Sequence, residues 1–321
     1  MSKISKKNLY CRLCSSTRLN NVFSLGATPP GNALYDNKNS CENTHYPLDV
    51  DLCIKCGHLQ LSHTVDPEEL FQSEYSYLSG TSPVFREYLK KYAEKICNEF
   101  KKHINFSILD IGSNDGTCLK FFQDQGCKVL GIDPAQNAVE IALKKGVPTI
   151  LDFFNVKTSQ NIYNEFGKFD LITSHNTLAH IDNLIETFQS IESLMHLNSI
   201  FIFEVGYRLD IIKNFWFDTI YHEHLDYHAV SPLKKCLNGL GLKIFRVERG
   251  SQQGGSIRVY CCLTKSKTEV EDSLQNIIEI ENTEKLFNIS TYNRYYKILK
   301  KNRFELKNII SEYKNSNKKV V

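Results

Sequence analysis

The stretch Leu109-Asp-Ile-Gly-Ser-Asn-Asp-Gly-Thr117 is a glycine-rich turn that follows an apolar run and precedes an amphipathic segment. Gly112 would let the chain turn sharply after a strand, and Gly116 would keep the start of the next helix close to a ligand. Free backbone amides at such a helix start can hold a carboxylate or phosphate oxygen. The stretch therefore predicts the first strand, loop and helix of an α/β nucleotide-binding fold.

The residues around this loop show the pattern of parallel βα units, in which short apolar runs alternate with amphipathic segments. We predict strands at 107–111, 128–132, 148–151, 169–174 and 199–205, and helices at 116–125, 135–145 and 182–196. Two further strand-like runs, 242–248 and 256–263, flank a glycine-rich segment and can form an antiparallel hairpin. The predicted fold is a doubly wound, Rossmann-like α/β sheet with an antiparallel edge.

Acidic residues around the loop indicate the kind of cofactor. Asp133 lies about twenty residues after the loop, at the end of the second predicted strand, where a carboxylate can accept both hydroxyls of a ribose. Asp110 and Asp115 flank the loop, and two carboxylates would repel a pyrophosphate but are tolerable near an ammonium and a sulfonium. The sequence favours S-adenosylmethionine over a dinucleotide, with a NAD-dependent sugar oxidoreductase as the rival enzyme.

Four of the 11 cysteines form two Cys-x-x-Cys pairs, Cys11 with Cys14 and Cys53 with Cys56. Two such turns can place four thiolates at the corners of a tetrahedron, as a closed structural zinc site requires. Gly57 supports the second turn, since tight turns of this kind often need a positive φ. A redox role would need only one pair in a thioredoxin-like context, and coincidence is the remaining alternative. We expect structural Zn²⁺.

Length, charge and hydropathy indicate the general class of protein. The chain has 321 residues, a net charge of +3, 41% hydrophobic and 23% charged residues, which is typical of a globular protein of roughly two domains. Its longest apolar runs are strand-sized, well short of the ~18 residues of a membrane-spanning helix. The amino terminus has polar residues where a signal peptide needs an apolar core, and the cysteine pairs lack a basic surrounding. We expect a cytoplasmic protein without membrane or nucleic-acid binding.

Three regions follow from these signals. Residues 1–75 are expected to form the zinc-binding module and a substrate loop, and residues 76–265 the cofactor-binding domain. Ser82 followed by Pro83 is a typical helix start, and the apolar positions after it keep helical spacing. Residues 266–321 are expected to be a helical tail.

Tyr221-His222-Glu223-His224 follows the fifth predicted strand, at the sheet edge where α/β proteins bind ligands. The motif concentrates a phenol, two imidazoles and a carboxylate, which suits acid–base chemistry near pH 7. His-x-His can also bind a metal, and a Tyr-His cluster can be part of a hydrogen-bonded core. The residues alone leave these alternatives open.

Taken together the motifs resemble the sugar C-methyltransferases, a class I methyltransferase family that acts on nucleotide-linked 4-keto-6-deoxysugars. The resemblance rests on the two cysteine pairs and on six stretches, namely 75–82, 110–116, 131–135, 175–180, 221–224 and 254–258. It implies an amino-terminal zinc module, a central S-adenosylmethionine domain and a carboxy-terminal domain that helps to hold the nucleotide sugar. The implied reaction is methylation of a sugar carbon, carbon 3, through an enolate.

The resemblance also implies residue roles. His224 would be the base, Tyr221 and Glu223 would orient it or the sugar, and His180 with Tyr75 or Tyr77 would donate hydrogen bonds to the enolate oxygen. The expected cofactor contacts are Asp110, Gly112, Asn114, Asp115, Gly116, Asp133, Pro134, Asp152, Phe153 and His175. His222 takes no role, and His175 could equally cap a strand.

The end of the chain differs from the family pattern. Family members continue for about a domain beyond a segment that resembles 314–321, which there leads into another strand. We therefore expect the carboxy-terminal domain to be absent here, and a partner chain or downstream fragment to supply it. The non-enzyme alternative is a truncated subunit that binds the cofactor but needs such a partner for chemistry.

Overall fold

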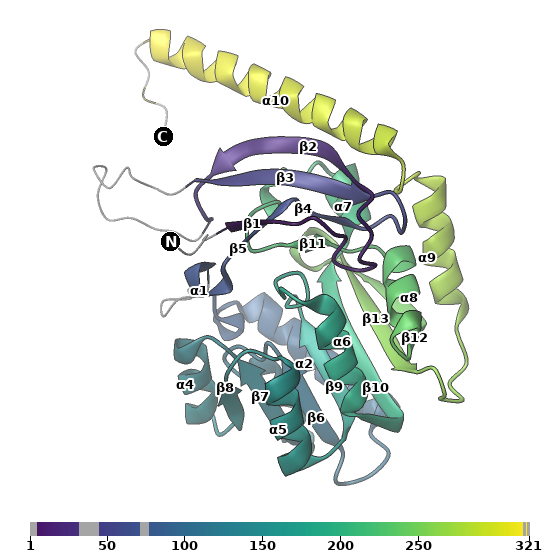
Figure 1. The fold of residues 1–321 in the computed structure, drawn as a ribbon. Helices are drawn as coiled ribbons and strands as arrows, with labels where there is room; N and C mark the ends of the chain where they lie inside the picture. Colours follow the sequence, from purple (N-terminus) through teal and green to yellow (C-terminus); the bar gives the residue numbers. More distant parts are fainter. Residues whose placement is uncertain (1–4, 32–44, 71–76, 317–318, 320–321) are drawn as a thin grey trace.

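The computed structural model describes residues 5–31, 45–70, 77–316 and 319 and has a seven-stranded sheet at its centre (Figure 1). The strand order is β12-β13-β10-β9-β6-β7-β8. These strands are β6 Ser107–Ile111, β7 Lys128–Asp133, β8 Thr149–Leu151, β9 Phe169–His175, β10 Met195–Gly206, β12 Leu242–Gly250 and β13 Ser256–Leu263. The five strands β6 to β10 run parallel to one another. β13 pairs antiparallel with both β10 and β12. The predicted fold class is confirmed, antiparallel edge included.

Helices cover both faces of this sheet. The helices concerned are α2 Pro83–Phe100, α3 Thr117–Asp124, α4 Gln136–Lys144, α5 Val156–Phe166, α6 Leu184–Ser193 and α8 Val230–Gly239. α7 Arg208–Lys213 instead contributes Ile211 and Ile212 to a third buried cluster, which it shares with amino-terminal residues such as Val50. Apolar residues of α2, α3 and α4 form one buried cluster against the sheet, and those of α5, α6 and α8 join a second cluster. α2 starts as predicted, since the Ser82 hydroxyl accepts from the Phe85 amide and Pro83 stands at the first helical position.

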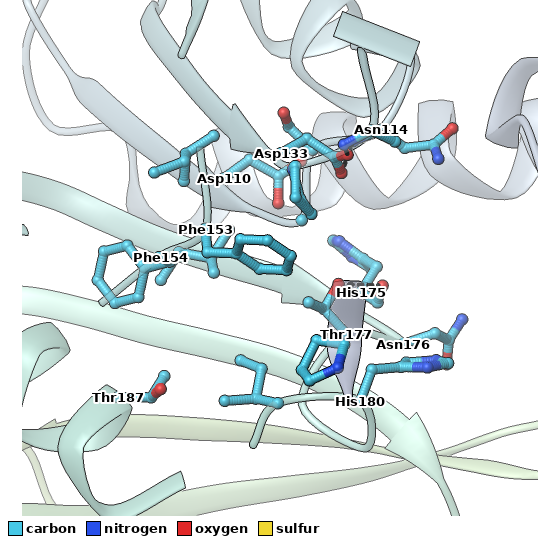
Figure 2. Close-up of a pocket in the computed structure, with 18 of the residues that line it drawn as sticks. Asp110, Asn114, Asp133, Phe153, Phe154, His175, Asn176, Thr177, His180 and Thr187 are labelled. Atoms are coloured by element: carbon cyan, nitrogen blue, oxygen red, sulfur yellow. Dashed lines mark hydrogen bonds between the residues drawn. The ribbon is translucent and has the colours of Figure 1, made fainter. Parts of the chain in front are cut away.

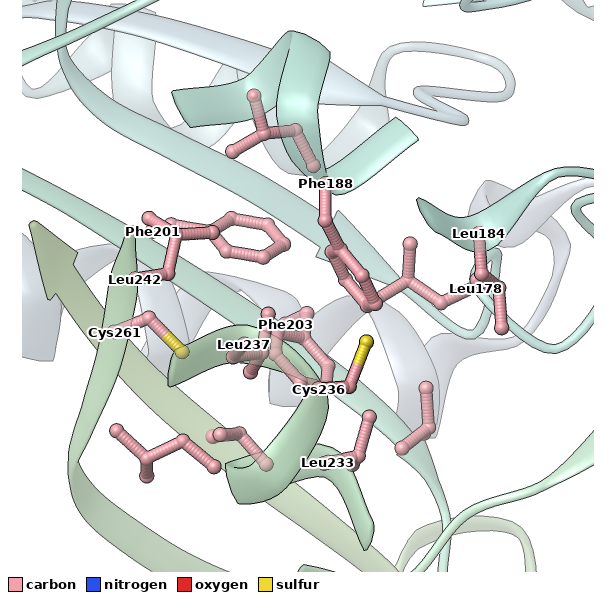
Figure 3. Packing of buried hydrophobic residues seen from close by; sticks show 14 of the residues in the cluster. Leu178, Leu184, Phe188, Phe201, Phe203, Leu233, Cys236, Leu237, Leu242 and Cys261 are labelled. Atoms are coloured by element: carbon pink, nitrogen blue, oxygen red, sulfur yellow. The ribbon is translucent and has the colours of Figure 1, made fainter. Parts of the chain in front are cut away.

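The side chains of β10 alternate between the two faces of the sheet and therefore join both buried clusters. Phe201 and Phe203 point to one face, where Phe188 of α6 packs on both rings at centroid distances of 6.4 and 6.3 Å (Figure 3). Ile202 points to the opposite face and belongs to the other cluster. This period of two buries both faces of one strand.

The amino-terminal part forms a second, four-stranded sheet in the order β11-β4-β3-β2, with bounds β2 Leu19–Thr28, β3 Tyr46–Cys53, β4 Leu59–Leu61 and β11 Asp226–Tyr227. Its edge strand β11 comes from the region just after the Tyr221 to His224 motif and pairs antiparallel with β4. β1 Ser5–Lys7 pairs with β5 His63–Val65, and the short helix α1 Pro67–Leu70 follows. The zinc module is therefore built partly from the methyltransferase region.

Two helices complete the chain, α9 Asp272–Thr283 and α10 Ile289–Asn315. α10 lies along β2, where Tyr295 and Tyr296 pack against Phe23 at centroid distances of 5.5 and 6.0 Å (Figure 1). Within the described residues no helix is both long and apolar enough to cross a membrane.

Three details differ from the sequence prediction. The predicted helix 182–196 is shorter, because Asn183 caps α6 and β10 already begins at Met195. α5 was not predicted, although Asn155 and Thr158 form a capping box at its start. α8 was not predicted either, and it packs Leu233 and Leu237 into the second cluster. Tertiary packing, more than local periodicity, defines these two helices.

Candidate functional site: a cofactor cavity beside a zinc cluster

The four cysteines of the two pairs lie together as predicted. The Cys11 and Cys56 sulfurs are 3.6 Å apart, as are those of Cys14 and Cys53, and all four lie within 4.8 Å of one another. Gly57 has a φ of 83°, and its amide donates to the Cys53 carbonyl, which closes the second turn. Four thiolates about 2.3 Å from one Zn²⁺ would be roughly 3.8 Å apart, so this arrangement fits a structural zinc ion.

A cavity of about 700 Å³ opens at the carboxyl ends of β6, β7 and β9. The cofactor loop lies on one side of it, and the segment that follows β9 lies on the other (Figure 2). Eleven of the predicted site residues line it: Tyr77, Asp110, Gly112, Asn114, Asp133, Pro134, Phe153, His175, His180, Tyr221 and His224. One cavity therefore holds groups from both the expected cofactor set and the expected catalytic set.

Two carboxylates equip the cofactor side of the cavity. Asp110 is buried, and its Oδ1 has no hydrogen-bond partner among the described residues. Burial and the neighbouring Asp133 raise the pKa of Asp110 well above its ordinary value, an effect that a bound cation would offset. Asp133 accepts from the Asn114 and Ala135 amides at 2.8 and 2.9 Å. Both carboxylates fit S-adenosylmethionine, Asp110 toward its ammonium and Asp133 toward its ribose.

Gly112 has a structural reason to be glycine. Its φ is 74°, and a Cβ there would lie 2.1 Å from Oγ1 of Thr177. The cofactor loop and the segment after β9 thus approach each other closely at the cavity floor. Gly116, with a φ of 71°, begins α3 against Ala142 in a similar way.

Two predicted cofactor residues mainly hold a neighbouring segment. The Asn114 side chain accepts from the Ser79 amide at 2.9 Å and donates to the Tyr77 carbonyl at 3.0 Å. The carboxylate of Asp115 accepts from the Gly80 amide at 3.1 Å and pairs with Lys145 at 2.9 Å. Asp115 and Gly116 do not line the cavity. The side chains of Asn114 and Asp115 therefore hold residues 77–80 against the cofactor loop.

Of the two expected cofactor residues that follow β8, only one lines the cavity. Phe153 lines the cavity, whereas the exposed Asp152 lies outside the lining and accepts from the Phe153 amide at 2.8 Å. His175 lines the cavity with its ring edge-on to Tyr92, at a centroid distance of 4.5 Å. Burial lowers the pKa of His175 to about 4, so the ring is neutral at physiological pH.

On the opposite side, His224 has a defined tautomer. Its Nδ1 lies 2.8 Å from the Thr219 carbonyl oxygen, which can only accept, so Nδ1 carries the proton. Nε2 is therefore unprotonated, and its lone pair accepts from the Tyr221 hydroxyl at 3.3 Å. Burial lowers the pKa of His224 below its ordinary value, against the opposing effect of the Thr219 bond. His224 is thus a neutral imidazole, and both it and Tyr221 line the cavity.

His180 packs edge-on against His224 at a centroid distance of 4.8 Å. Burial, with His224 beside it, lowers the pKa of His180 to about 3. Glu223 is buried beside these residues but does not line the cavity. His222 Nε2 donates to the Tyr46 carbonyl of β3 at 3.1 Å, which is a structural contact with the zinc module.

Of the two tyrosines expected from the loop before α2, Tyr75 lies outside the described residues. Tyr77 lines the cavity, and its hydroxyl is 3.5 Å from the amide of Gln253, which comes from the turn between β12 and β13. Sequence reasoning missed Gln253 and Thr177 because neither belongs to a charged or aromatic motif.

Comparisons with known proteins agree with this organisation. Family models match residues 11–71 (zinc binding domain), 84–247 (methyltransferase domain) and 251–321 (C-methyltransferase C-terminal domain). The C-methyltransferase NovU of Streptomyces niveus is 28% identical over 301 residues, which cover 94% of this chain and 71% of NovU. A ubiquinone biosynthesis O-methyltransferase of Bartonella tribocorum is 28% identical over 118 residues, or 34% of this chain and 47% of that protein.

Solved methyltransferase structures align with part of the chain. The plantazolicin methyltransferase BpumL in complex with a pentazolic desmethylPZN analogue and SAH aligns with a TM-score of 0.46 and 17% identity, over 62% of this chain and 92% of BpumL. Magnesium protoporphyrin IX methyltransferase of Synechocystis PCC 6803 with bound SAM aligns with a TM-score of 0.42 and 14% identity, over 56% of this chain and 79% of that one.

One expectation is overturned by these matches. The carboxy-terminal domain was expected to be absent, but the C-methyltransferase C-terminal domain model matches 251–321. That segment contributes β13 to the central sheet and packs α10 on β2, so it is an integrated part of the fold. The expectation of a partner chain or downstream fragment rested on the absence of that domain and loses its basis.

The methyltransferase domain model spans half of the chain, and the cavity at its centre offers the carboxylates that a sulfonium cofactor needs. These findings replace the alternative of a NAD-dependent oxidoreductase. The chain belongs to the methyltransferase domain family, and it is an S-adenosylmethionine-dependent methyltransferase with a zinc-binding domain at its amino terminus.

Proposed function

We propose that this methyltransferase transfers a methyl group to carbon, at carbon 3 of a nucleotide-linked 4-keto-6-deoxysugar, through an enolate. The observation that carries the proposal is the tautomer of His224, a residue that lines the cofactor cavity and whose Nε2 is unprotonated. The match of a C-methyltransferase C-terminal domain and the similarity to NovU, named a C-methyltransferase, support it.

Methylation of carbon requires a base because a C–H bond beside a ketone is only weakly acidic. His224 would take the proton from carbon 3, and the electron pair of that bond would move toward the carbonyl oxygen at carbon 4. The neutral form of His224 is available because burial lowers its pKa. The Nδ1 bond to Thr219 holds the ring in place and stabilises the imidazolium that forms.

The negative charge on the enolate oxygen needs hydrogen-bond donors. Tyr77 and Tyr221 both line the cavity, and His180 lies against His224. The Tyr221 hydroxyl donates to Nε2 of His224 at rest and would become available to the enolate once Nε2 has taken the proton. Glu223 would act through the backbone segment that holds His224, since its side chain lies outside the cavity lining. Asp110 and Asp133 would hold S-adenosylmethionine, which when bound would supply an electrophilic methyl group for carbon 3.

The test is a reaction of the purified chain with S-adenosylmethionine and a nucleotide-linked 4-keto-6-deoxyhexose in deuterated water. Proton NMR should show deuterium at carbon 3 without S-adenosylmethionine, and a new C–CH₃ signal with it. A methyl group on oxygen, or no exchange at carbon 3, would overturn the proposal. A sugar without the 4-keto group is the control and should neither exchange nor be methylated.

A further inference from the structure

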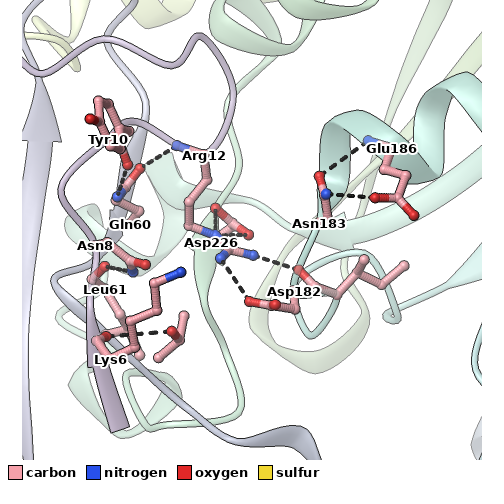
Figure 4. A network of polar contacts seen from close by, with 12 residues as sticks. Lys6, Asn8, Tyr10, Arg12, Gln60, Leu61, Asp182, Asn183, Glu186 and Asp226 are labelled. Atoms are coloured by element: carbon pink, nitrogen blue, oxygen red, sulfur yellow. Dashed lines mark hydrogen bonds and ion pairs between the residues drawn. The ribbon is translucent and has the colours of Figure 1, made fainter. Parts of the chain in front are cut away.

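Arg12 connects the zinc cluster to both segments that carry the cavity histidines. It lies between the zinc ligands Cys11 and Cys14, and its side chain is only 7% exposed. Its Nε lies 3.0 Å from both carboxylate oxygens of Asp226, and its terminal nitrogen donates to the Ile181 carbonyl at 2.5 Å (Figure 4). One guanidinium thus contacts two segments far apart in sequence.

The partners of Arg12 directly follow the histidines in the chain. Ile181 is the residue after His180, and Asp226 is the second residue after His224. The two segments are also joined to each other, because the Leu225 amide donates to the Ala179 carbonyl at 2.7 Å. The position of the guanidinium therefore constrains the distance between the two rings.

The zinc cluster fixes where this guanidinium can be. The first cysteine turn is closed by the Ser15 amide, which donates to the Cys11 carbonyl, and its two thiolates would be held by one zinc ion. The Arg12 amide donates to the Gln60 side chain at 2.8 Å, and Gln60 faces Asp226 in the β4–β11 ladder. The side chain of Arg12 thus contacts β11 directly, and its backbone amide contacts Gln60 of the neighbouring strand β4.

Asp226 depends on these contacts. Its side chain is 0% exposed, and it accepts from Arg12 and lies 2.7 Å from His58 Nε2. A buried carboxylate that loses its arginine is poorly compensated, and the surrounding segment moves to relieve it. Movement at Asp226 displaces His224, which is two residues away.

We infer that Arg12 is a positioning residue for His180 and His224, so that the zinc module aligns the groups proposed for proton transfer. The inference rests on the proposed role of His224. Arg12 itself does not line the cavity and touches neither cofactor nor substrate there. Its effect should therefore fall on the chemical step and leave cofactor affinity unchanged.

The experiment compares Arg12→Gln and Arg12→Lys with the matched control Arg18→Gln, in the full zinc-loaded chain. Arg18 belongs to the same module, is exposed and forms no ion pair with the described residues. Arg12→Gln should keep one zinc per chain and bind S-adenosylmethionine within about twofold of wild type, while kcat and carbon 3 exchange fall about 100-fold. Arg12→Lys should lie between them, because an ammonium can pair with Asp226 but lacks the fork that also reaches Ile181. Arg18→Gln should match wild type.

Histidine-selective NMR of the same proteins gives a readout that needs no substrate. The ring signals of His180 and His224, assigned with single variants, should shift in Arg12→Gln and not in Arg18→Gln. Wild-type ring signals and kcat in Arg12→Gln would overturn the inference, as would a loss of cofactor affinity that parallels the loss of kcat. If Arg12→Gln does not fold, Arg12→Lys decides by the same two readouts. Absence of carbon 3 exchange in the wild-type chain would overturn the proposed function instead, and the ring signals would still test the role of Arg12.

Discussion

The Nδ1 atom of His224 lies 2.8 Å from the carbonyl oxygen of Thr219, five residues earlier in the chain. This single bond assigns the proton to Nδ1 and leaves Nε2 unprotonated, as the basic atom of the ring. Thr219 ends the short 3₁₀ helix Phe217–Thr219, so the bond ties the histidine to a turn just before its own motif.

His224→Ala should abolish turnover and carbon 3 exchange and leave the affinity for S-adenosylmethionine within about twofold. Loss of a general base typically costs about 10²- to 10⁴-fold in rate. Isothermal titration gives the affinity, and NMR gives both rates. Unchanged turnover would remove the histidine from this role and make His180 the next candidate.

The pH dependence of kcat/KM follows from the lowered pKa of His224. The base must be neutral, and its pKa in the folded protein lies below the ordinary value of 6.5. Activity should therefore persist as the pH falls to 6.5 and decline only as the pH passes the lowered pKa. The check is a kcat/KM profile between pH 4.5 and 8 with wild type and Tyr221→Phe, which removes the hydroxyl near Nε2 and keeps the ring. A decline centred above pH 6.5 would contradict a buried, neutral base.

Asp133→Ala should weaken S-adenosylmethionine binding by about 1.5–3 kcal/mol, as expected for lost charge-assisted hydrogen bonds. The matched variant Asp152→Ala removes an exposed carboxylate outside the cavity lining and should cost less than about 0.5 kcal/mol. Titration calorimetry measures both. Equal losses would show that Asp152 contacts the cofactor, as the resemblance implies.

Asp115→Asn should destabilise the fold rather than remove a cofactor contact. Hydrogen bonds and the ion pair to Lys145 outweigh burial and lower the pKa of Asp115, so its contribution is present above the unfolded pKa of about 3.8. That contribution is lost as the pH falls through the lowered folded pKa. Urea unfolding should show a loss of about 1 kcal/mol at pH 7 that shrinks toward pH 3. Asp124→Asn, in the exposed pair with Lys120, is the control and should change little.

Metal analysis should find about one Zn²⁺ per chain, and Cys11→Ser should lower both the zinc content and the midpoint of thermal unfolding. Cys262→Ser is the matched control, since Cys262 is equally buried but stands in β13 away from the cluster. Folded protein with metal content near zero would contradict the assignment.

Local signals predicted the central fold well. β6 and β13 have the bounds expected from sequence, because apolar runs flanked by turns are unambiguous there. The cofactor loop was also predictable, since Gly112 and Asp133 act within one βαβ unit. The contacts of Asn114 and Asp115 with residues 79 and 80 were not, because a polar side chain beside a ligand loop can face the ligand or the next segment.

Long-range polar contacts were beyond the reach of the sequence. Arg12 stands inside a cysteine turn, where an arginine is ordinarily a solvated spacer, and its partner Asp226 is 214 residues away. Arg258 gives a similar case, since it is buried in β13 and pairs with Glu204 of β10 at 2.9 Å. Such pairs depend on strand register, which a single sequence does not fix.

The pairing of β11 with β4 sets an order of events during synthesis on the ribosome. His58 and Asp226 are separated by 168 residues, and at about 5–20 residues per second that interval takes roughly 10 to 30 s. During this interval the cysteine turns can already bind zinc. The edge of β4 and the charge of Arg12 are not yet paired with β11. An amino-terminal segment that had bound zinc at this stage would therefore expose an unpaired sheet edge until β11 emerges.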